Sequence, residues 1–346
     1  MTPRPIELRS DNAAGVAPEI LAAIDAANEG SALAYGGDHM TARLREVMRE
    51  VFEHPTAEVF PVVSGTAANS LALSALCPPW GSVLCHETAH IFANEGGATS
   101  LFSGGAVMRG LPEFGYKLAP ATVQTAFDST NWGDPHHSQP SVISVTCPTD
   151  FGTVYTPAEL RDLSALGRTR GLRMHLDGAR FANALVTLGC SPGELTWEAG
   201  VDAFSLGATK NGVLSTDAIV CFDPLVAEQL VFRLKRAGHV ASKMRYQSAQ
   251  LVAYLTDGLW LRLAGRANDA MAALSSGLRS QGVEFLNEPQ ANMLFANFGE
   301  STAAALAEAG LLFYGMGNGV VRFVTSFQTT DADVADVLAR VQRALS

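Results

Sequence analysis

Residues 172–180 read Leu-Arg-Met-His-Leu-Asp-Gly-Ala-Arg, and residues 203–210 read Ala-Phe-Ser-Leu-Gly-Ala-Thr-Lys. Each segment starts as a short apolar run and ends in glycine and polar residues, which predicts a buried strand followed by a turn. Similar apolar runs, separated by longer helical patterns, occupy residues 58–63, 83–85, 141–145 and 218–222. Strands that alternate with helices and are apolar on both faces indicate an α/β fold with a mainly parallel sheet. Ligands bind such sheets at the carboxyl ends of the strands, so the polar residues there are candidates for a site.

The last third of the chain predicts a second, smaller α+β domain. Residues 283–286, 293–296 and 320–324 are strand-like, and residues 331–345 have apolar spacing typical of a closing helix. A long helical pattern over residues 233–255 leads out of the first domain. A chain of 346 residues exceeds the usual size of one core. We therefore expect a large domain over residues 1–255, N-terminal segment included, and a small one over residues 256–346.

Composition narrows the class of protein. Hydrophobic residues make up 47% and charged residues 17% of the chain, which is typical of a globular enzyme. The net charge of −10 argues against a nucleic-acid partner. Five scattered cysteines form no C-x-x-C pair, and neither a signal peptide nor an 18-residue apolar span is recognisable, so we expect a cytoplasmic protein without a membrane partner.

Lys210 and two neighbours of the other quoted segment could carry the chemistry of a site. A lysine enclosed at a strand end has a lowered pKa and becomes a nucleophile toward a carbonyl, although most lysines are simply solvated. Asp177 could pair with a protonated pyridine nitrogen, and the fork of Arg180 could bind a substrate carboxylate. The alternative is that Asp177 caps a helix and Arg180 is a surface cation. The three together favour the functional interpretation.

The segment Ser64-Gly65-Thr66-Ala67-Ala68-Asn69 lies between a predicted strand and a predicted helix. Small residues at a helix N-terminus let backbone N–H groups and a hydroxyl approach a phosphate. The segment matches neither a P-loop nor a dinucleotide fingerprint. Residues 315–319, Gly-Met-Gly-Asn-Gly, are also rich in glycine, and a turn is the simpler interpretation there.

The segment His86-Glu87-Thr88-Ala89-His90 matches the H-E-x-x-H pattern of zinc proteases. Ala93 and Gly96 stand where the extended pattern has glycine and a third histidine. The segment also follows an apolar run, where a loop after a strand is expected. We therefore predict no metal site, and instead an imidazole at His90 that stacks on a flat cofactor ring.

Taken together, these segments resemble the L-threonine aldolases, a family of fold-type I pyridoxal-phosphate enzymes that includes phenylserine aldolase. The resemblance covers nearly the whole chain, and its most specific parts are His175–Arg180 and Gly207–Gly212. It is supported by Leu8–Asp11, Tyr35–Asp38, Ser64–Asn69, His90–Phe92, Glu95–Ala98, Ser242–Tyr246 and Val321–Thr325.

The resemblance implies a role for each matching residue. Lys210 would carry pyridoxal 5′-phosphate as a Schiff base, Asp177 would bind its pyridine nitrogen, and His90 would stack on its ring. Either His90 or His136 would be the base, with His137 as the neighbouring alternative to His136. Phosphate contacts would come from Ser64, Gly65 and Thr66, and contacts to the substrate carboxylate from Ser10, Arg180 and Arg322.

The same resemblance implies an activity and an assembly. The enzyme would cleave L-3-hydroxy-α-amino acids to glycine and an aldehyde, as a homodimer or homotetramer with shared active sites to which Tyr35, Lys243 and Arg245 could contribute. Asn12 and Gly37 depart from the usual family residues and are similar to the branch that holds phenylserine aldolase and some low-specificity bacterial threonine aldolases. Threonine and phenylserine both remain open as substrates. Rival functions are another fold-type I lyase or aminotransferase, a metalloprotease, and a silent pyridoxal-phosphate-binding protein.

Overall fold

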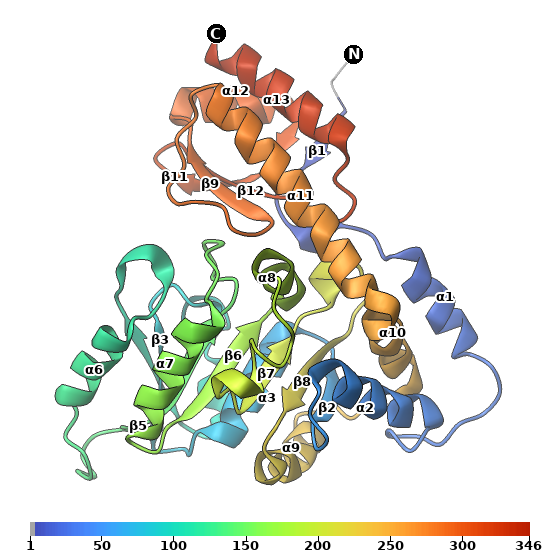
Figure 1. The fold of residues 1–346 in the computed structure, drawn as a ribbon, viewed down its shortest axis with the longest axis vertical. Helices are drawn as coiled ribbons and strands as arrows, with labels where there is room; N and C mark the ends of the chain where they lie inside the picture. Colours follow the sequence, from blue (N-terminus) through green and yellow to red (C-terminus); the bar gives the residue numbers. More distant parts are fainter. Residues whose placement is uncertain (1–3) are drawn as a thin grey trace.

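The computed structural model describes residues 4–346 and has a large α/β part with a smaller α+β part above it (Figure 1). The large part contains a seven-stranded sheet in the order β2-β8-β7-β6-β5-β3-β4. Its strands are β2 Glu58–Val62, β3 Gly81–His86, β4 Val107–Leu111, β5 Gln139–Thr146, β6 Arg173–Gly178, β7 Ala203–Leu206 and β8 Asp217–Cys221. Only β8 runs in the opposite direction to the other six strands, so the sheet is mainly parallel, as predicted.

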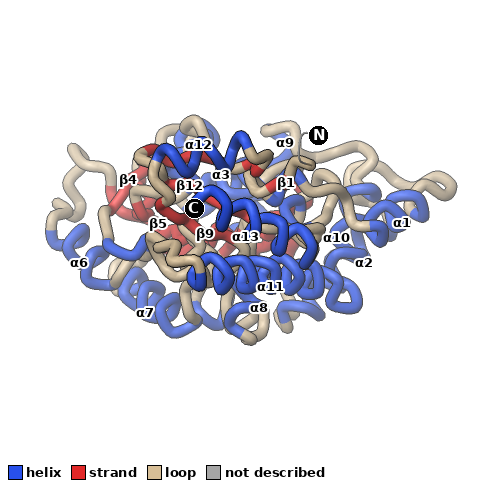
Figure 2. Tube along the Cα trace, turned by 90° about the horizontal axis from the view of Figure 1, so that it is seen from above, coloured by secondary structure: helices blue, strands red, loops and turns tan. Residues whose placement is uncertain are grey.

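Helices cover both faces of this sheet, and Figure 2 shows the strands between the two helical layers. One face packs on α3 Gly65–Leu76 and α9 Pro224–Arg236, whose apolar residues share a core with β3 and β8. The core on the other face includes residues of α2 His39–Phe52, α6 Pro120–Asp128, α7 Pro157–Arg168, α8 Phe181–Leu188 and α10 Arg245–Leu255. Apolar cover on both faces explains why the strands read as continuous apolar runs.

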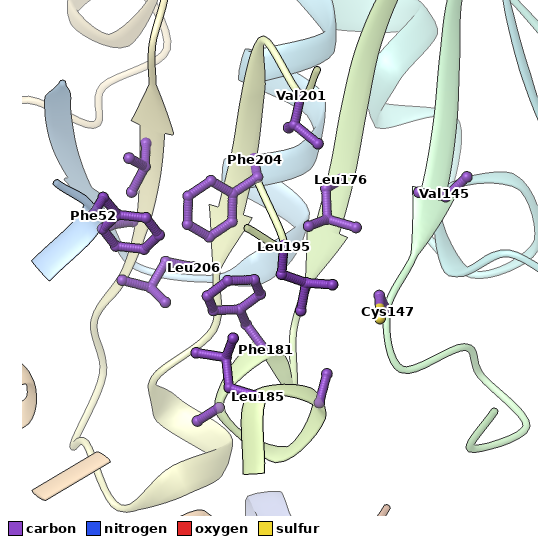
Figure 3. Packing of buried hydrophobic residues seen from close by; sticks show 14 of the residues in the cluster. Phe52, Val145, Cys147, Leu176, Phe181, Leu185, Leu195, Val201, Phe204 and Leu206 are labelled. Carbon is purple, nitrogen blue, oxygen red and sulfur yellow. The ribbon is translucent and has the colours of Figure 1, made fainter. Parts of the chain in front are cut away.

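Three aromatic rings fill the centre of the second core (Figure 3). Phe52 of α2, Phe181 of α8 and Phe204 of β7 are buried, with ring centroids 5.0–6.0 Å apart. Such ring pairs add to the stabilisation that burial itself provides. Because Phe181 directly follows Arg180 and Phe204 lies on the strand before Lys210, this packing fixes the two segments that carry the predicted site.

The helical pattern over residues 233–255 forms two helices rather than the single one predicted. α9 ends at Arg236, and α10 begins at Arg245. Gly238, with φ of +79°, lies in the left-handed region that commonly follows a helix end. The turn brings the start of α10 against residues 28–38, where Ser242 accepts a hydrogen bond from the backbone of Tyr35.

The small part is built from the end of the chain together with its beginning. An antiparallel sheet in the order β11-β12-β9 comprises β9 Met293–Asn297, β11 Tyr314–Gly317 and β12 Val320–Val324. It packs with α11 Leu259–Ser280, α12 Glu300–Glu308 and α13 Asp331–Leu345. In place of the strand predicted over 283–286, the described chain forms a single bridge from Phe285 to Ala296.

The first described strand belongs with this small part. β1 Ile6–Glu7 pairs in parallel with β10 Leu311–Leu312, whereas the predicted division placed the N-terminal segment with the large domain. The apolar side chains of Ile6 and Leu8 are buried in the small core, which explains the pairing. α11 contacts both α8 and α13 and so links the two parts, while α1 Pro18–Ala26 packs on α10 of the large part.

Candidate active site

The carboxyl ends of the parallel strands surround a cavity of about 240 Å³. The segments after β2, β3, β5, β6 and β7 all reach it, as the topology of an α/β sheet requires. Its wall includes Lys210, Asp177, Arg180, His90, Ser64, Gly65 and Thr66, all of which are predicted site residues. Asn12, Asn69, Glu95, Thr146, Asp150, Thr209 and Asp217 also line it, and none of these has a role assigned by the sequence.

One end of the cavity is suited to an anion. Ser64 caps α3, and its hydroxyl accepts a hydrogen bond from the backbone of Ala67 at 3.3 Å. The first N–H groups of this 12-residue helix, at Gly65 and Thr66, lie at the cavity wall. The Thr209 hydroxyl is buried and has no hydrogen-bond partner among residues 4–346. These donors fit a phosphate group.

Asp177 is the second-to-last residue of β6 and is 1% exposed. One carboxylate oxygen accepts a hydrogen bond from the backbone of Ala179 at 3.0 Å, and the other accepts from the Asn69 side chain at 2.9 Å. A carboxylate held this firmly at the cavity wall can pair with a protonated ring nitrogen of a planar cofactor.

Lys210 lies in the short 3₁₀ turn Thr209–Asn211 after β7. Burial lowers the pKa of its amine, and the Arg180 guanidinium lowers it further, while the charges of Asp11 and Asp177 act in the opposite direction. The neutral amine is the nucleophilic form, so the site favours attack on a carbonyl. Together with the anion-binding end and Asp177, Lys210 completes the groups that pyridoxal phosphate needs, and the residues present fit that cofactor.

His90 begins α4 His90–Ala93 and is held at two points. Its backbone N–H donates to Asp150 at 2.9 Å, and its ring Nδ1 lies 2.9 Å from the carboxylate of Glu95. The hydrogen bond to Glu95 raises the pKa of His90, burial opposes this, and the charges of Asp177 and Asp150 reinforce it. Burial also raises the pKa of both Glu95 and Asp150. The imidazole is thus a proton-accepting group at a defined place in the cavity.

Arg180 is paired with a buried carboxylate. Asp11 accepts from Nε of Arg180 at 2.6 Å and from Nη2 at 2.9 Å. Arg322 lies on β12 of the small part, where its Nη2 donates to the backbone of Arg9 at 3.0 Å. Its buried Nε has no partner in the described chain, and burial and the nearby Arg180 both lower its pKa. Arg322 is not among the residues that line the cavity, but it lies close enough to Arg180 and Asp11 for their charges to act on it.

Three predicted site residues, Ser10, His136 and Arg322, are not among those that line this cavity. The hydroxyl of Ser10 instead caps the 3₁₀ turn Asp11–Ala13 by accepting from the backbone of Asn12 at 3.2 Å. His136 is exposed and precedes β5, whereas the cavity lies beyond the other end of that strand at Thr146. A strand of eight residues spans roughly 25 Å, so His136 cannot reach the cavity of its own subunit.

The residues considered for sharing between subunits also lie away from the cavity. Tyr35 is 59% exposed and packs under the Lys235 amine, 4.7 Å from its ring centre. Arg245 donates to the backbone of Gly30, and Lys243 is exposed.

The H-E-x-x-H segment does not form the helix that a zinc protease uses. His86 is the last residue of β3, and its ring nitrogens lie 2.8 Å from the Thr88 hydroxyl and 3.0 Å from the Glu113 carbonyl oxygen. His90 begins a separate helix, and Glu87 is exposed. Across residues 4–346 no group of three or more His, Cys, Asp or Glu side chains is placed to hold a metal ion.

Fold and cavity together define a fold-type I pyridoxal-phosphate enzyme. The aspartate aminotransferase of Thermus thermophilus shares this fold with a TM-score of 0.71 at 18% identity, over 99% of this chain and 92% of that one. A sequence profile described as beta-eliminating lyase matches residues 7–301. A low-specificity L-threonine aldolase from a Pseudomonas species is 42% identical over all of both chains. The threonine aldolase structure from Leishmania major has a TM-score of 0.92 at 26% identity, over 99% of this chain and 100% of that one. The chain belongs to the beta-eliminating lyase family, among the threonine aldolases.

Within the described residues no helix is long and apolar enough to cross a membrane.

Proposed function

We propose that the protein is a pyridoxal-phosphate-dependent aldolase that cleaves L-3-hydroxy-α-amino acids to glycine and an aldehyde. The observation that carries the proposal is the position of His90, a proton acceptor held by Glu95 in the same cavity as Lys210 and Arg180. A transaminase needs no group to take a proton from a β-hydroxyl, whereas an aldolase does. The full-length similarity to low-specificity L-threonine aldolases supports the same reaction.

The chain's own residues account for the steps of a retro-aldol cleavage. When bound, pyridoxal phosphate supplies the sink for the electrons of the broken Cα–Cβ bond. Arg180 and Arg322 bind the substrate carboxylate and thereby orient the amino acid. His90 takes the β-hydroxyl proton as the carbon–oxygen double bond of the aldehyde forms. The Lys210 amine, which would hold the cofactor when no substrate is bound, would supply the proton that Cα takes up to give glycine.

His136 enters this proposal only across a subunit boundary. Its exposed position before β5 leaves it free to approach a second copy of the chain, and we extend the proposal to a homodimer or homotetramer. The apolar side chain of Val63 lines the cavity and yet is 57% exposed. This exposure supports the proposal that a second subunit covers the entrance of the cavity. Mixing a Lys210→Ala protein with a His136→Ala protein tests this, because hybrid oligomers regain activity only if each site uses residues of two subunits.

The substrate choice also remains part of the proposal. Asn12, one of the two departures from the usual family residues, lines the cavity, and this supports a preference that includes phenylserine as well as threonine. Comparing kcat/KM for L-threonine, L-allo-threonine and L-phenylserine decides between them.

The direct experiment is a visible absorption spectrum of the purified protein, with and without L-threonine, coupled to detection of acetaldehyde and glycine. Lys210→Ala removes both the absorbance of the lysine-bound cofactor and the turnover. Release of ammonia, or transfer of the amino group to a keto acid, would instead identify a β-eliminating lyase or an aminotransferase. Turnover in Lys210→Ala at the wild-type rate would overturn the assignment of the lysine.

A further inference from the structure

Four side chains form a continuous chain of hydrogen bonds, in the order Asp177, Asn69, Glu95 and His90. The Nδ2 atom of Asn69 lies 2.9 Å from Oδ2 of Asp177 and also 2.9 Å from Oε1 of Glu95. The same Oε1 lies 2.9 Å from Nδ1 of His90. Asn69 is 2% exposed and Glu95 is 7% exposed, so water does not compete for these bonds. Neither Asn69 nor Glu95 has a role assigned by the sequence.

The donors and acceptors along this chain of hydrogen bonds determine which ring nitrogen of His90 carries a proton. The amide of Asn69 has two N–H bonds, and each points to a carboxylate. An ionised Glu95 can only accept, so Nδ1 of His90 must be the donor in the third bond. A neutral His90 then has its lone pair on Nε2. The backbone N–H of His90 donates to Asp150, which holds the main chain of this residue in place. With Nδ1 occupied by Glu95, Nε2 is the ring atom that can accept a substrate proton.

The charges around His90 act in one direction. Glu95 contacts its ring, Asp150 contacts its backbone, and Asp177 lies at the far end of the chain of hydrogen bonds, so all three favour the protonated imidazole. Burial acts against them, and the hydrogen bonds from Asn69 and His90 help to keep Glu95 ionised against its own burial. Asn69 therefore joins the carboxylate assigned to the cofactor nitrogen to the carboxylate assigned to the base.

We propose that Asn69 and Glu95 are positioning residues, which hold His90 in the tautomer that leaves Nε2 free and couple that histidine to the charge at Asp177. The proposal rests on the aldolase function proposed above. Its consequence is a difference between the cofactor-free and cofactor-bound protein. A protonated ring nitrogen beside Asp177 offsets the negative charge there, so His90 should titrate at a lower pH once the cofactor is bound.

The first experiment reads the tautomer and does not depend on turnover. ¹⁵N-histidine labelling gives signals for all eight histidines. The signals of His90 are identified by their loss in His90→Phe. Above the titration midpoint of His90, we expect the neutral imidazole to carry its proton on Nδ1 and not on Nε2, and we expect this midpoint to be lower in the holoenzyme than in the apoprotein. A neutral imidazole with its proton on Nε2 in the wild-type holoenzyme, or equal midpoints in the two forms, overturns the proposal even if the enzyme is an aldolase.

The second experiment reads the pH profile of kcat/KM. Glu95→Gln keeps a hydrogen-bond acceptor but removes the charge, so the acid limb should move to lower pH by about one unit. The rate at neutral pH should fall about tenfold, as is typical when the partner of a functional histidine is replaced. Asn69→Leu should move the acid limb in the same direction, because the amide no longer helps to keep Glu95 ionised.

Glu87→Gln is the matched control, since it is the same substitution three residues from His90 on an exposed side chain. It should leave the profile unchanged. An acid limb that stays in place in Glu95→Gln contradicts the coupling. If Asn69→Leu does not fold, Glu95→Gln and the wild-type spectra still decide. Failure of the aldolase proposal is recognised separately, by absence of glycine and aldehyde in the wild type while the tautomer measurement stands.

Discussion

Asp11 forms a two-bond ion pair with Arg180, at 2.6 and 2.9 Å, and both side chains are nearly inaccessible to solvent. The pair joins a residue beside the small part of the molecule to a residue at the end of the central sheet. Because Asp11 occupies Nε and Nη2, the Nη1 side of the guanidinium remains for a substrate carboxylate. The pair therefore orients the arginine before any substrate arrives.

Asp11→Asn should weaken both folding and substrate binding. The change leaves a buried guanidinium without its charge partner, and breaking such pairs lowers the free energy of unfolding by about 3 kcal/mol or more. We also expect KM to rise at least tenfold with a smaller change in kcat, since the orientation of Arg180 is lost. Urea unfolding and steady-state kinetics measure the two effects. Glu46→Gln, which breaks an exposed pair with Arg43, is the control and should change stability by less than about 1 kcal/mol.

Arg322→Gln should raise KM for L-threonine about tenfold or more, because the fork of the guanidinium is lost from the proposed carboxylate site. Arg322→Lys should recover only part of the loss. An amino alcohol that lacks the carboxylate provides the control substrate. If Arg322→Gln impairs cleavage of that compound as strongly as cleavage of threonine, Arg322 does not act on the carboxylate.

His175 should make the protein sensitive to mild acid. This residue of β6 is fully buried, and burial lowers its pKa from 6.5 to about 4. As the pH falls below 6.5, His175 becomes protonated in the unfolded chain but stays neutral in the folded protein. The free energy of unfolding therefore declines until the pH nears 4. The shift corresponds to a loss of about 3 kcal/mol over that window. Unfolding free energies of wild type and His175→Gln, measured across this range, should converge toward low pH. Exposed His39→Gln should follow the wild type, and parallel curves for His175→Gln would refute the prediction.

Gly207→Ala should impair cofactor binding. A Cβ at this position would collide with the backbone of Ala179, which lies between Asp177 and Arg180. Either this segment or the turn that carries Lys210 must then move, and we expect affinity for pyridoxal phosphate to fall at least tenfold. Titration of the apoprotein measures it. Gly265→Ala in α11 is the control, since a Cβ there meets nothing within 4 Å and should leave the affinity unchanged.

Local sequence was sufficient to predict the residues that follow strand ends. Asp177, Lys210 and His90 each lie just after an apolar run, and a parallel sheet brings such positions together whatever the details of packing. The same reasoning could not find Asp11, which follows no strand of the main sheet, or Glu95, which is separated from β3 by the short helix α4. Their importance depends on burial and on partners far away in the chain. Leu8–Asp11 and Glu95–Ala98 were noticed only as resemblances, and these were the available signals.

Three features of the fold and the site could not be read from the sequence. The apolar pattern of residues 233–255 is continuous, and only the positive φ of Gly238 and the turn that follows break it into two helices. The role expected for His136 rests on resemblance to a family histidine, and resemblance carries no information on which subunit's cavity a residue faces. The direction of β8 was equally unreadable, because a strand buried on both faces looks the same in either direction.

The pairing of β1 with β10 determines when the active site can form during synthesis. During synthesis, residues near Asp11 leave the ribosome first, yet the strand that anchors them, Leu311–Leu312, is among the last to be made. The central sheet can form earlier, since its strands end at Cys221. A nascent chain can thus contain a folded central sheet before Asp11 has paired with Arg180. The active site is complete only after β1, near the start of the chain, has paired with β10, near its end.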